Sequence, residues 1–169
     1  LHMTFCDGNT YICNDPYSYE GLITEEEEKL FSQGNWTEVY HKMGCHKVKL
    51  GDTEGMYFAV WVPDAKRVSV IGDFNYWNGM LYPMHKLNNS DIFELFIPGL
   101  SCGQFYKFEV KNTQGQVIQM IDPYAVMNEE KKDGASRMFD LNRFRWEDSR
   151  WLTERYRGNM FRIPMSVCE

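Results

Sequence analysis

The sequence predicts a mainly β protein, an all-β sandwich of seven to eight strands with a short N-terminal helical segment and a C-terminal extension. Two observations indicate this fold. Between residues 47 and 141, short runs of β-branched and aromatic residues are interrupted by Gly, Pro and Asn about every eight to twelve residues. The chain has 169 residues, of which 43% are hydrophobic, so it is long enough to bury a core of its own.

The first predicted segment, residues 4–46, is an arm followed by short helices. Thr24 and Glu27 form a capping box, and the acidic run 25–28 lies at the positive end of the helix dipole. These signals predict a helix from about Glu25 to Ser32.

A second capping box, Asn35 with Glu38, predicts another short helix, which would carry Trp36. Gly44 stands where a residue in the left-handed conformation would end that helix. The sequence therefore predicts two helical turns before the first strand.

The central segment, residues 47–141, carries the predicted sandwich. Phe58 and Trp61 are expected in its core, because aromatic side chains pack in the interior of strands. The predicted strands are Lys47–Leu50, Met56–Val62, Arg67–Gly72, Tyr82–Lys86, Ile92–Ile97, Phe105–Lys111, Val117–Ile121 and Arg137–Leu141.

Alternation within a strand predicts which side chains face the core. In the run 105–111, Tyr106 and Phe108 fall on one side of the strand and Lys107 falls on the other. We therefore expect Lys107 on the wetter face of its sheet.

The last segment, residues 142–169, mixes arginines with aromatic residues. Such a pattern can stack on single-stranded nucleic acid, or it can dock one domain onto another, because guanidinium groups stack on rings and are weakly hydrated. The net charge of −6 favours docking. The closing run Ile163–Glu169 is apolar and strand-like, and we expect it to begin a further domain and to be disordered or paired with a neighbouring chain when that domain is absent.

The composition argues against several classes of function. The chain has 18 Lys and Arg against 24 Asp and Glu, so nucleic-acid phosphates or an anionic membrane would repel it. No apolar run approaches the roughly 20 residues of a membrane-spanning helix. Five cysteines at irregular spacing favour a reduced, cytoplasmic protein over a disulfide framework.

No metal or cofactor is expected. A zinc site favours paired ligands such as Cys-x-x-Cys, and the sequence has none. His41 and His46 are five residues apart, which does not place two imidazoles on one face of a helix.

The most informative stretch is 57–77. It predicts a strand, a turn at Pro63 and Asp64, and a second strand that ends in a Gly-Asp-Phe-Asn corner and projects Trp77 outward. The indole ring offers a flat apolar face to the C–H face of a glucose unit. Another interpretation is that the ring folds over the edge of the sandwich.

Three polar side chains are the expected partners of sugar hydroxyls beside this ring. Asn75 and Asn78 flank Trp77 in the sequence, and Lys107 lies in the predicted strand 105–111. We therefore take Trp77, Lys107, Asn75 and Asn78 as candidate carbohydrate-binding residues.

The stretch resembles the family 48 carbohydrate-binding module, whose signature is Trp-x-Pro-x-Ala followed by Val-x-Val-x-Gly-Asp-Phe-Asn-x-Trp. Later landmarks of that family follow in order at 97–100, 106–108 and 122–125. Residues 40–48 and 140–151 are similar to the segments that flank this module in glycogen branching enzymes, and residues 164–169 are similar to the first strand of their catalytic barrel.

The resemblance implies an immunoglobulin-like sandwich and an α-glucan ligand. In branching enzymes, which cut α-1,4 glucan and rejoin the piece through an α-1,6 bond, the catalytic carboxylates lie on a barrel far downstream. The resemblance thus implies that the chain has no catalytic residue and docks on that barrel.

The resemblance also implies weak binding. Trp77 and Lys107 match the principal stacking and sugar-contacting residues of the family. The kinase-subunit type of the module has a second stacking tryptophan after a Gly-Gln step, where this chain has Val117, and its later threonine and asparagine contacts fall near Ala135 and Arg137.

Two alternatives share the same module. One is a stand-alone glycogen-binding subunit like the β subunit of AMP-activated kinase. The other is the front module of a debranching or trehalose-forming enzyme. A barrel-like strand after residue 151 favours the branching enzyme over the stand-alone subunit.

Overall fold

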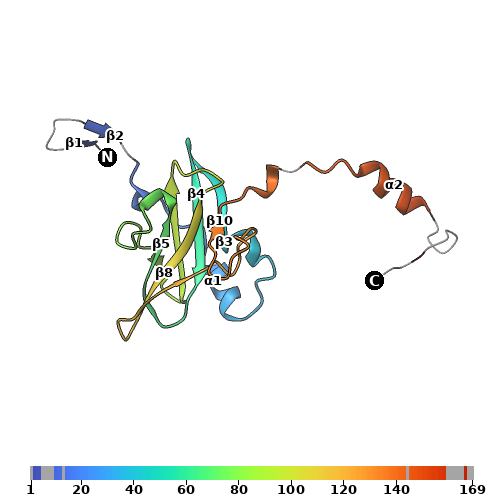
Figure 1. Ribbon diagram of the computed structural model, residues 1–169. Coiled ribbons are helices and arrows are strands. Elements are labelled where there is room, and N and C mark those ends of the chain that lie inside the picture. The colour runs from blue at the N-terminus through green and yellow to red at the C-terminus, as the bar shows by residue number, and fades with distance from the viewer. Residues whose placement is uncertain (1, 5–9, 13, 144, 159–165, 167–169) are drawn as a thin grey trace.

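The computed structural model describes residues 2–4, 10–12, 14–143, 145–158 and 166. Two antiparallel four-stranded sheets face each other (Figure 1), which confirms the predicted sandwich. The first sheet has the order β3-β4-β7-β6, with bounds Gly44–Leu50, Thr53–Trp61, Ile92–Pro98 and His85–Lys86. The second is built on β8, and its strands are β5 (Ala65–Gly72), β8 (Phe105–Asn112), β9 (Val117–Met120) and β10 (Ser136–Arg137).

The core lies between the two sheets because apolar residues alternate along the strands. In β8, Tyr106, Phe108 and Val110 are buried, and the residues between them are partly exposed. This confirms the predicted faces of the strand. Phe58, on β4, is fully buried in the same core, as predicted, and its ring meets Tyr106 edge-on at 5.2 Å.

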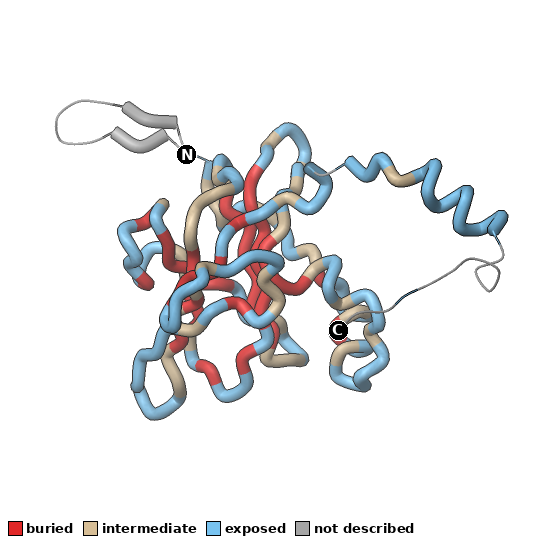
Figure 2. Tube along the Cα trace, turned by 45° about the vertical axis from the view of Figure 1, so that its right-hand side comes forward, coloured by how far each residue is buried: buried red, intermediate tan, exposed pale blue. Residues whose placement is uncertain are grey.

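The central strands β4 and β7 are buried on both faces. Their outward side chains, among them Tyr57, Ile92 and Phe96, form a second apolar cluster with Ile23 and Met43. Residues 16–43 therefore act as a third layer over the first sheet, and Figure 2 shows the buried positions concentrated in and beside the strands.

The helix α1 spans Glu25–Ser32, as predicted. Its capping box is present, because the side chain of Thr24 accepts from the backbone N–H of Glu27 and the Glu27 carboxylate accepts from the N–H of Thr24. Lys42 donates to the same carboxylate at 2.6 Å, which ties α1 to the chain just before β3.

Two predictions in this layer are wrong. The second helix is only a 3-10 turn, η2 (Val39–His41), with no side-chain cap. Gly44 has a φ of 97° but begins β3, and a Cβ there would lie 3.0 Å from the Cβ of Tyr124. Its left-handed backbone lets β3 start against Tyr124, and does not end a helix.

Trp61 is not in the core, contrary to the prediction. It is 47% exposed, and its ring centroid lies 6.1 Å from that of Phe31. Trp61 shares the outward side of β4 with Tyr57 and Ala59, but it is the last residue of the strand, where the covering layer ends.

Several short elements complete the chain. The predicted strand at 82–86 shortens to β6, and at the predicted strand 137–141 the structure has β10, which starts one residue earlier and ends at Arg137. β1 and β2 pair with each other; β2 lies in the predicted arm, and β1 starts before it at His2. The helix α2, which was not predicted, lies away from the sandwich with all its residues exposed (Figures 1 and 2). The remaining bounds are β1 His2–Thr4, β2 Thr10–Ile12, η1 Pro16–Ser18, η3 Asp73–Asn75, η4 Leu141–Arg143 and α2 Ser149–Arg157.

Other predictions remain open. The run Ile163–Glu169 lies outside the described residues apart from residue 166. The division of the chain at residues 47 and 141 stays a prediction. Over the part of the chain that the structure describes, no helix is long and apolar enough to cross a membrane, and no cluster of three or more His, Cys, Asp or Glu could hold a metal ion.

Candidate carbohydrate-binding site

The corner after β5 fixes the backbone around Trp77. The chain leaves Gly72 through η3, and then Tyr76 and Trp77 both adopt the left-handed conformation, with φ values of 54° and 60°. That conformation costs about 1 kcal/mol or more for a non-glycine residue. The N–H of Trp77 returns to the carbonyl of Gly72 at 3.0 Å, so the corner closes on itself.

Asn75 holds this corner from inside. Its side chain is buried, with 2% exposed. Its Oδ1 accepts from the N–H of Gly72 at 2.9 Å, and its Nδ2 donates to the carbonyls of Val70 and Asn78 at 2.9 and 3.2 Å. These bonds take the place of the backbone hydrogen bonds between strands, which the chain can no longer form where it turns out of the sheet. Asn75 therefore positions the corner, and its amide atoms are not presented to a ligand.

The loop after the corner lies on the outer face of the second sheet. A Cβ at Gly79 would lie 2.0 Å from Oε1 of Glu109, so the loop backbone passes directly over that carboxylate. Glu109 pairs with Arg67 at 2.6 Å, and Arg67 also reaches the sulfur of Met80 at 3.2 Å. The ion pair and the glycine together seat the loop on β5 and β8.

Lys107 and Val117 share this outer face. Lys107 lies two residues before Glu109 on β8 and so points to the same side of the sheet. Val117 pairs with Lys111 across β8 and β9, which places it on that side as well. The Nζ of Lys107 donates to the carbonyl of Asp133 at 2.8 Å. The fold thus brings Lys107, Val117 and the Trp77 loop to one face.

The predicted binding residues differ in how exposed their side chains are. Trp77 is 36% exposed, and Asn78 is exposed while its Oδ1 accepts from the N–H of Met80 at 2.9 Å. Tyr76, which is not among the predicted residues, is 93% exposed beside Trp77. The signal for Tyr76 is its place as an aromatic residue in a turn, where no core position is available.

The buried titratable groups lie elsewhere. The hydroxyl of Tyr106 donates to the buried Asp122 at 2.6 Å, and Asp122 also accepts from the N–H of Tyr124. Burial raises the pKa of Asp122, and burial together with the Asp122 carboxylate raises the pKa of Tyr106 well above its usual range. These bonds fix the segment after β9 to the core and supply no reactive pair at the corner.

Residues 42–125 match the family model described as carbohydrate-binding module 48 (isoamylase N-terminal domain). These residues are a family 48 carbohydrate-binding module. The matched range includes the corner, Lys107 and Val117. The described face is therefore a face of this module.

Curated relatives extend the similarity beyond the module. The chain is 42% identical over 164 residues to the 1,4-alpha-glucan branching enzyme GlgB of Thermosynechococcus vestitus, covering 96% of this chain and 21% of that protein. It is 40% identical over 155 residues to the enzyme of the same name from Protochlamydia amoebophila, covering 92% and 21%. The chain thus spans about a fifth of the length of these relatives.

Among solved structures the likeness is remote. The pullulanase of Klebsiella pneumoniae complexed with maltotriose is 23% identical, with a TM-score of 0.47, over 59% of this chain and 10% of that one.

Proposed function

We propose that the module binds α-glucan at the Trp77 corner. The observation that carries the proposal is a partly exposed indole on a rigid corner, on the same face of the sheet as Lys107, within a family 48 module. The ring would stack on a glucose unit, and Lys107 and Asn78 would bond its hydroxyls. Asn75 would act through the corner that it holds.

We propose that this binding is weak, with a dissociation constant in the millimolar range or higher. One flat ring is available at Trp77, and Tyr76 adds a second exposed ring beside it. The position of a second tryptophan in the kinase-subunit type is occupied here by Val117, whose side chain gives no stacking surface. Two adjacent rings at one corner contact only a short stretch of a glucan, so most of an oligosaccharide stays in water.

We propose that the parent protein is a 1,4-α-glucan branching enzyme, in which this region holds or positions glucan for a catalytic barrel and takes no part in the bond transfer. The similarity to two enzymes of that name, each about five times as long as the aligned region, supports this. The parent would act in the cytoplasm in glycogen synthesis. Residues 47–141 would form the module and residues 142–169 the connector to the barrel.

The connector supports a docking role. In α2, Trp151 and Tyr156 are 57% and 96% exposed, and the Arg155 guanidinium lies 5.2 Å from the ring centre of Trp151. Arginine stacked on an aromatic ring is a pair that interfaces favour. We propose that this helix packs on the barrel of the same chain.

A titration tests the glucan site. Maltoheptaose is added to the ¹⁵N-labelled chain, and the amide shifts around the corner are followed into the millimolar range. We expect shifts near Trp77 and Lys107, and their loss in the Trp77→Ala variant. Trp151→Ala, which removes an exposed indole from α2, is the matched control. It should show the same amide shifts on maltoheptaose addition as the unsubstituted chain. If Trp77→Ala binds maltoheptaose as tightly as the unsubstituted chain does, Trp77 is not part of the site.

A further inference from the structure

A cavity of about 350 Å³ lies on the other side of the sandwich, where residues 16–21 cross the outer face of the first sheet. Its volume is within the range of small-ligand sites, about 300–1,000 Å³. The lining residues that matter here are Tyr17, Tyr19, Tyr57, His85, Glu94 and Phe96. The Trp77 corner belongs to the second sheet, so the two places are built on different sheets.

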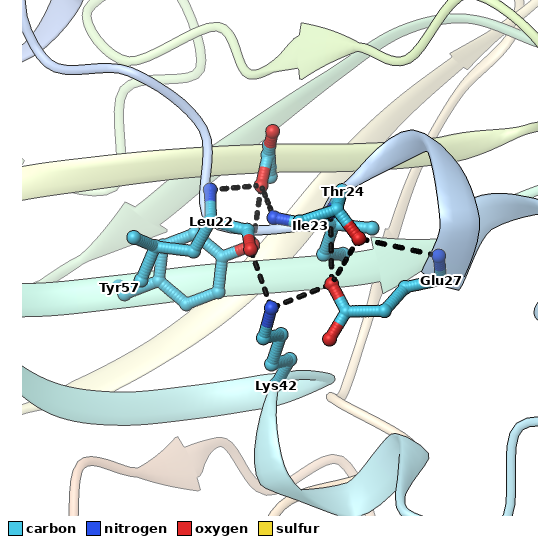
Figure 3. Close-up of polar contacts among 7 residues, drawn as sticks. Leu22, Ile23, Thr24, Glu27, Lys42 and Tyr57 are labelled. Atoms are coloured by element: carbon cyan, nitrogen blue, oxygen red, sulfur yellow. Dashed lines mark hydrogen bonds and ion pairs between the residues drawn. The ribbon is translucent and has the colours of Figure 1, made fainter.

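The polar floor of the cavity is held rigid by the fold. Glu94 is only 3% exposed, and its Oε2 accepts from the N–H groups of Leu22 and Ile23, at 3.0 and 3.2 Å, and from the hydroxyl of Tyr57. Figure 3 shows the N–H groups of Leu22 and Ile23 and the hydroxyl of Tyr57 directed at one carboxylate oxygen, with Lys42 below them. A carboxylate fixed by three donors cannot turn away when a ligand enters.

The second oxygen of Glu94 is differently placed. All hydrogen bonds to Glu94 from described residues go to Oε2. A Cβ at Gly21 would lie 1.7 Å from Oε1, so the glycine lets the chain pass close to this oxygen. Gly21 thus packs against one side of Oε1, and both residues line the cavity. Oε1 is the carboxylate oxygen that accepts no hydrogen bond from the described residues.

The walls combine aromatic rings with one further polar side chain. Tyr19 meets Phe96 edge-on at a centroid distance of 4.8 Å, and the hydroxyl of Tyr17 donates to the carbonyl of Pro83 at 3.1 Å. Both tyrosines are therefore held in place. His85 pairs directly with Glu94 across β6 and β7 and is exposed, so its imidazole stands on the same face as the carboxylate.

We propose that this cavity binds a single hexose unit of a glucan, as a second carbohydrate subsite of the chain. A sugar hydroxyl would donate to Oε1 of Glu94, another would bond the imidazole of His85, and the apolar face of the ring would lie against Tyr19. The inference that the ligand is a glucan rests on the proposed function. The cavity itself rests on its own residues.

A sugar hydroxyl matches the hydrogen-bonding position that this cavity leaves open. Three donors already surround the Glu94 carboxylate, and the ammonium of Lys42 donates to the carbonyl of Leu22 at 2.5 Å and to Glu27. Lys42 is therefore paired with Glu27 and is not among the lining residues, and Glu94 and Glu20 are the acidic side chains of the cavity. A hydroxyl needs only the free lone pairs of Oε1.

The test adds maltotriose and follows two sets of amide signals in one chain, those beside the cavity and those at the Trp77 corner. In the ¹⁵N-labelled Trp77→Ala variant, maltotriose should still shift the amides of Leu22, Ile23 and His85. The Tyr19→Leu variant should weaken that response about fivefold, since one aromatic wall is lost. Tyr17→Leu is the second variant if Tyr19→Leu unfolds, and Tyr40→Leu, in the same layer but outside this cavity, is the matched control.

The outcomes separate this proposal from the proposed function. Shifts at the corner of the parent chain without shifts at Leu22, Ile23 and His85 would overturn the second subsite and leave the corner site intact. Shifts at the cavity alone would support the subsite and count against the corner. A cavity response to tetramethylammonium chloride that exceeds the response to maltotriose would overturn the assignment to a sugar.

Discussion

On the outer face of the sheet β3-β4-β7-β6, Tyr57, Ile92 and Phe96 lie beneath residues 16–43. On the outer face of the other sheet, Arg67 and Glu109 form an ion pair, and the loop after Trp77 crosses them. The first face is apolar and is covered by a separate stretch of chain. The second is polar. The loop between β5 and β6 crosses it and the carbonyl of Asp133 reaches Lys107 on it, while side chains such as Tyr76 stay exposed.

One buried polar side chain ties each cover to its sheet. Glu94 accepts hydrogen bonds from backbone N–H groups of the N-terminal layer. Asn75 accepts from and donates to backbone groups at the corner. The difference lies in charge. Glu94 is a carboxylate that needs its donors in order to be buried, whereas Asn75 is neutral and gains or loses only ordinary hydrogen bonds. The first face therefore depends more strongly on its anchor than the second.

The largest effect is expected from Glu94→Leu. The substitution leaves the N–H groups of Leu22 and Ile23 and the hydroxyl of Tyr57 buried without their acceptor. We expect a loss of about 3–5 kcal/mol in the free energy of unfolding, measured by urea denaturation. Glu94→Gln, which keeps an oxygen acceptor, should lose clearly less. Equal losses in the two variants would show that the acceptor is not what holds this layer.

Asn75→Ala should cost less, about 2 kcal/mol, because it removes neutral bonds to Gly72, Val70 and Asn78. It should also weaken maltoheptaose binding although the residue is buried, since the left-handed backbone at Trp77 loses its support. Asn78→Ala, on the exposed side of the loop, is the control for stability and should change it by less than about 1 kcal/mol. A stable Asn75→Ala protein with unchanged binding would contradict the positioning role.

Val117→Trp should raise the affinity of the outer face of the second sheet for glucan. The side chain is 53% exposed and faces the same side as Lys107, so an indole there can stack on a sugar without entering the core. We expect maltoheptaose to bind about two- to tenfold more tightly, measured by calorimetry or by amide shifts. Ile118→Trp, on the opposite side of β9, is the matched control and should leave the affinity unchanged. A tighter Ile118→Trp variant would indicate non-specific stacking.

The smallest effect concerns Glu27 and is dependent on pH. Burial raises the pKa of Glu27, but hydrogen bonds from Lys42 and Thr24 outweigh it, so the pKa is lowered below 4.5. The ionised carboxylate therefore stabilises the fold above pH 4.5, and this contribution is lost as the pH falls through the lowered pKa.

Glu27→Gln tests that sign. At pH 7 we expect it to cost about 1 kcal/mol, in the range of caps and partly exposed ion pairs, and the difference from the unsubstituted chain should shrink as the pH falls through the lowered pKa. Glu25→Gln, in the same turn but without the bond to Thr24, is the control. A difference that grows as the pH falls would contradict the assignment.

The sandwich, the helix at Glu25–Ser32 and the module corner could be predicted from the sequence, because they depend on local patterns. Alternation of apolar residues sets the two faces of β8, the capping box sets the start of α1, and the Gly-Asp-Phe-Asn-x-Trp motif sets the turn. Each signal lies within a few residues of the structure that it produces.

Which side chains the folded layers leave accessible depends on tertiary packing and could not be predicted from local patterns. Trp61 is exposed because the N-terminal layer ends beside it, and Asn75 is withdrawn because its amide completes the corner. Glu94 is buried because a segment more than 70 residues earlier in the chain supplies its donors. Burial and hydrogen-bond satisfaction depend on which distant segments pack together, and no local pattern contains that information.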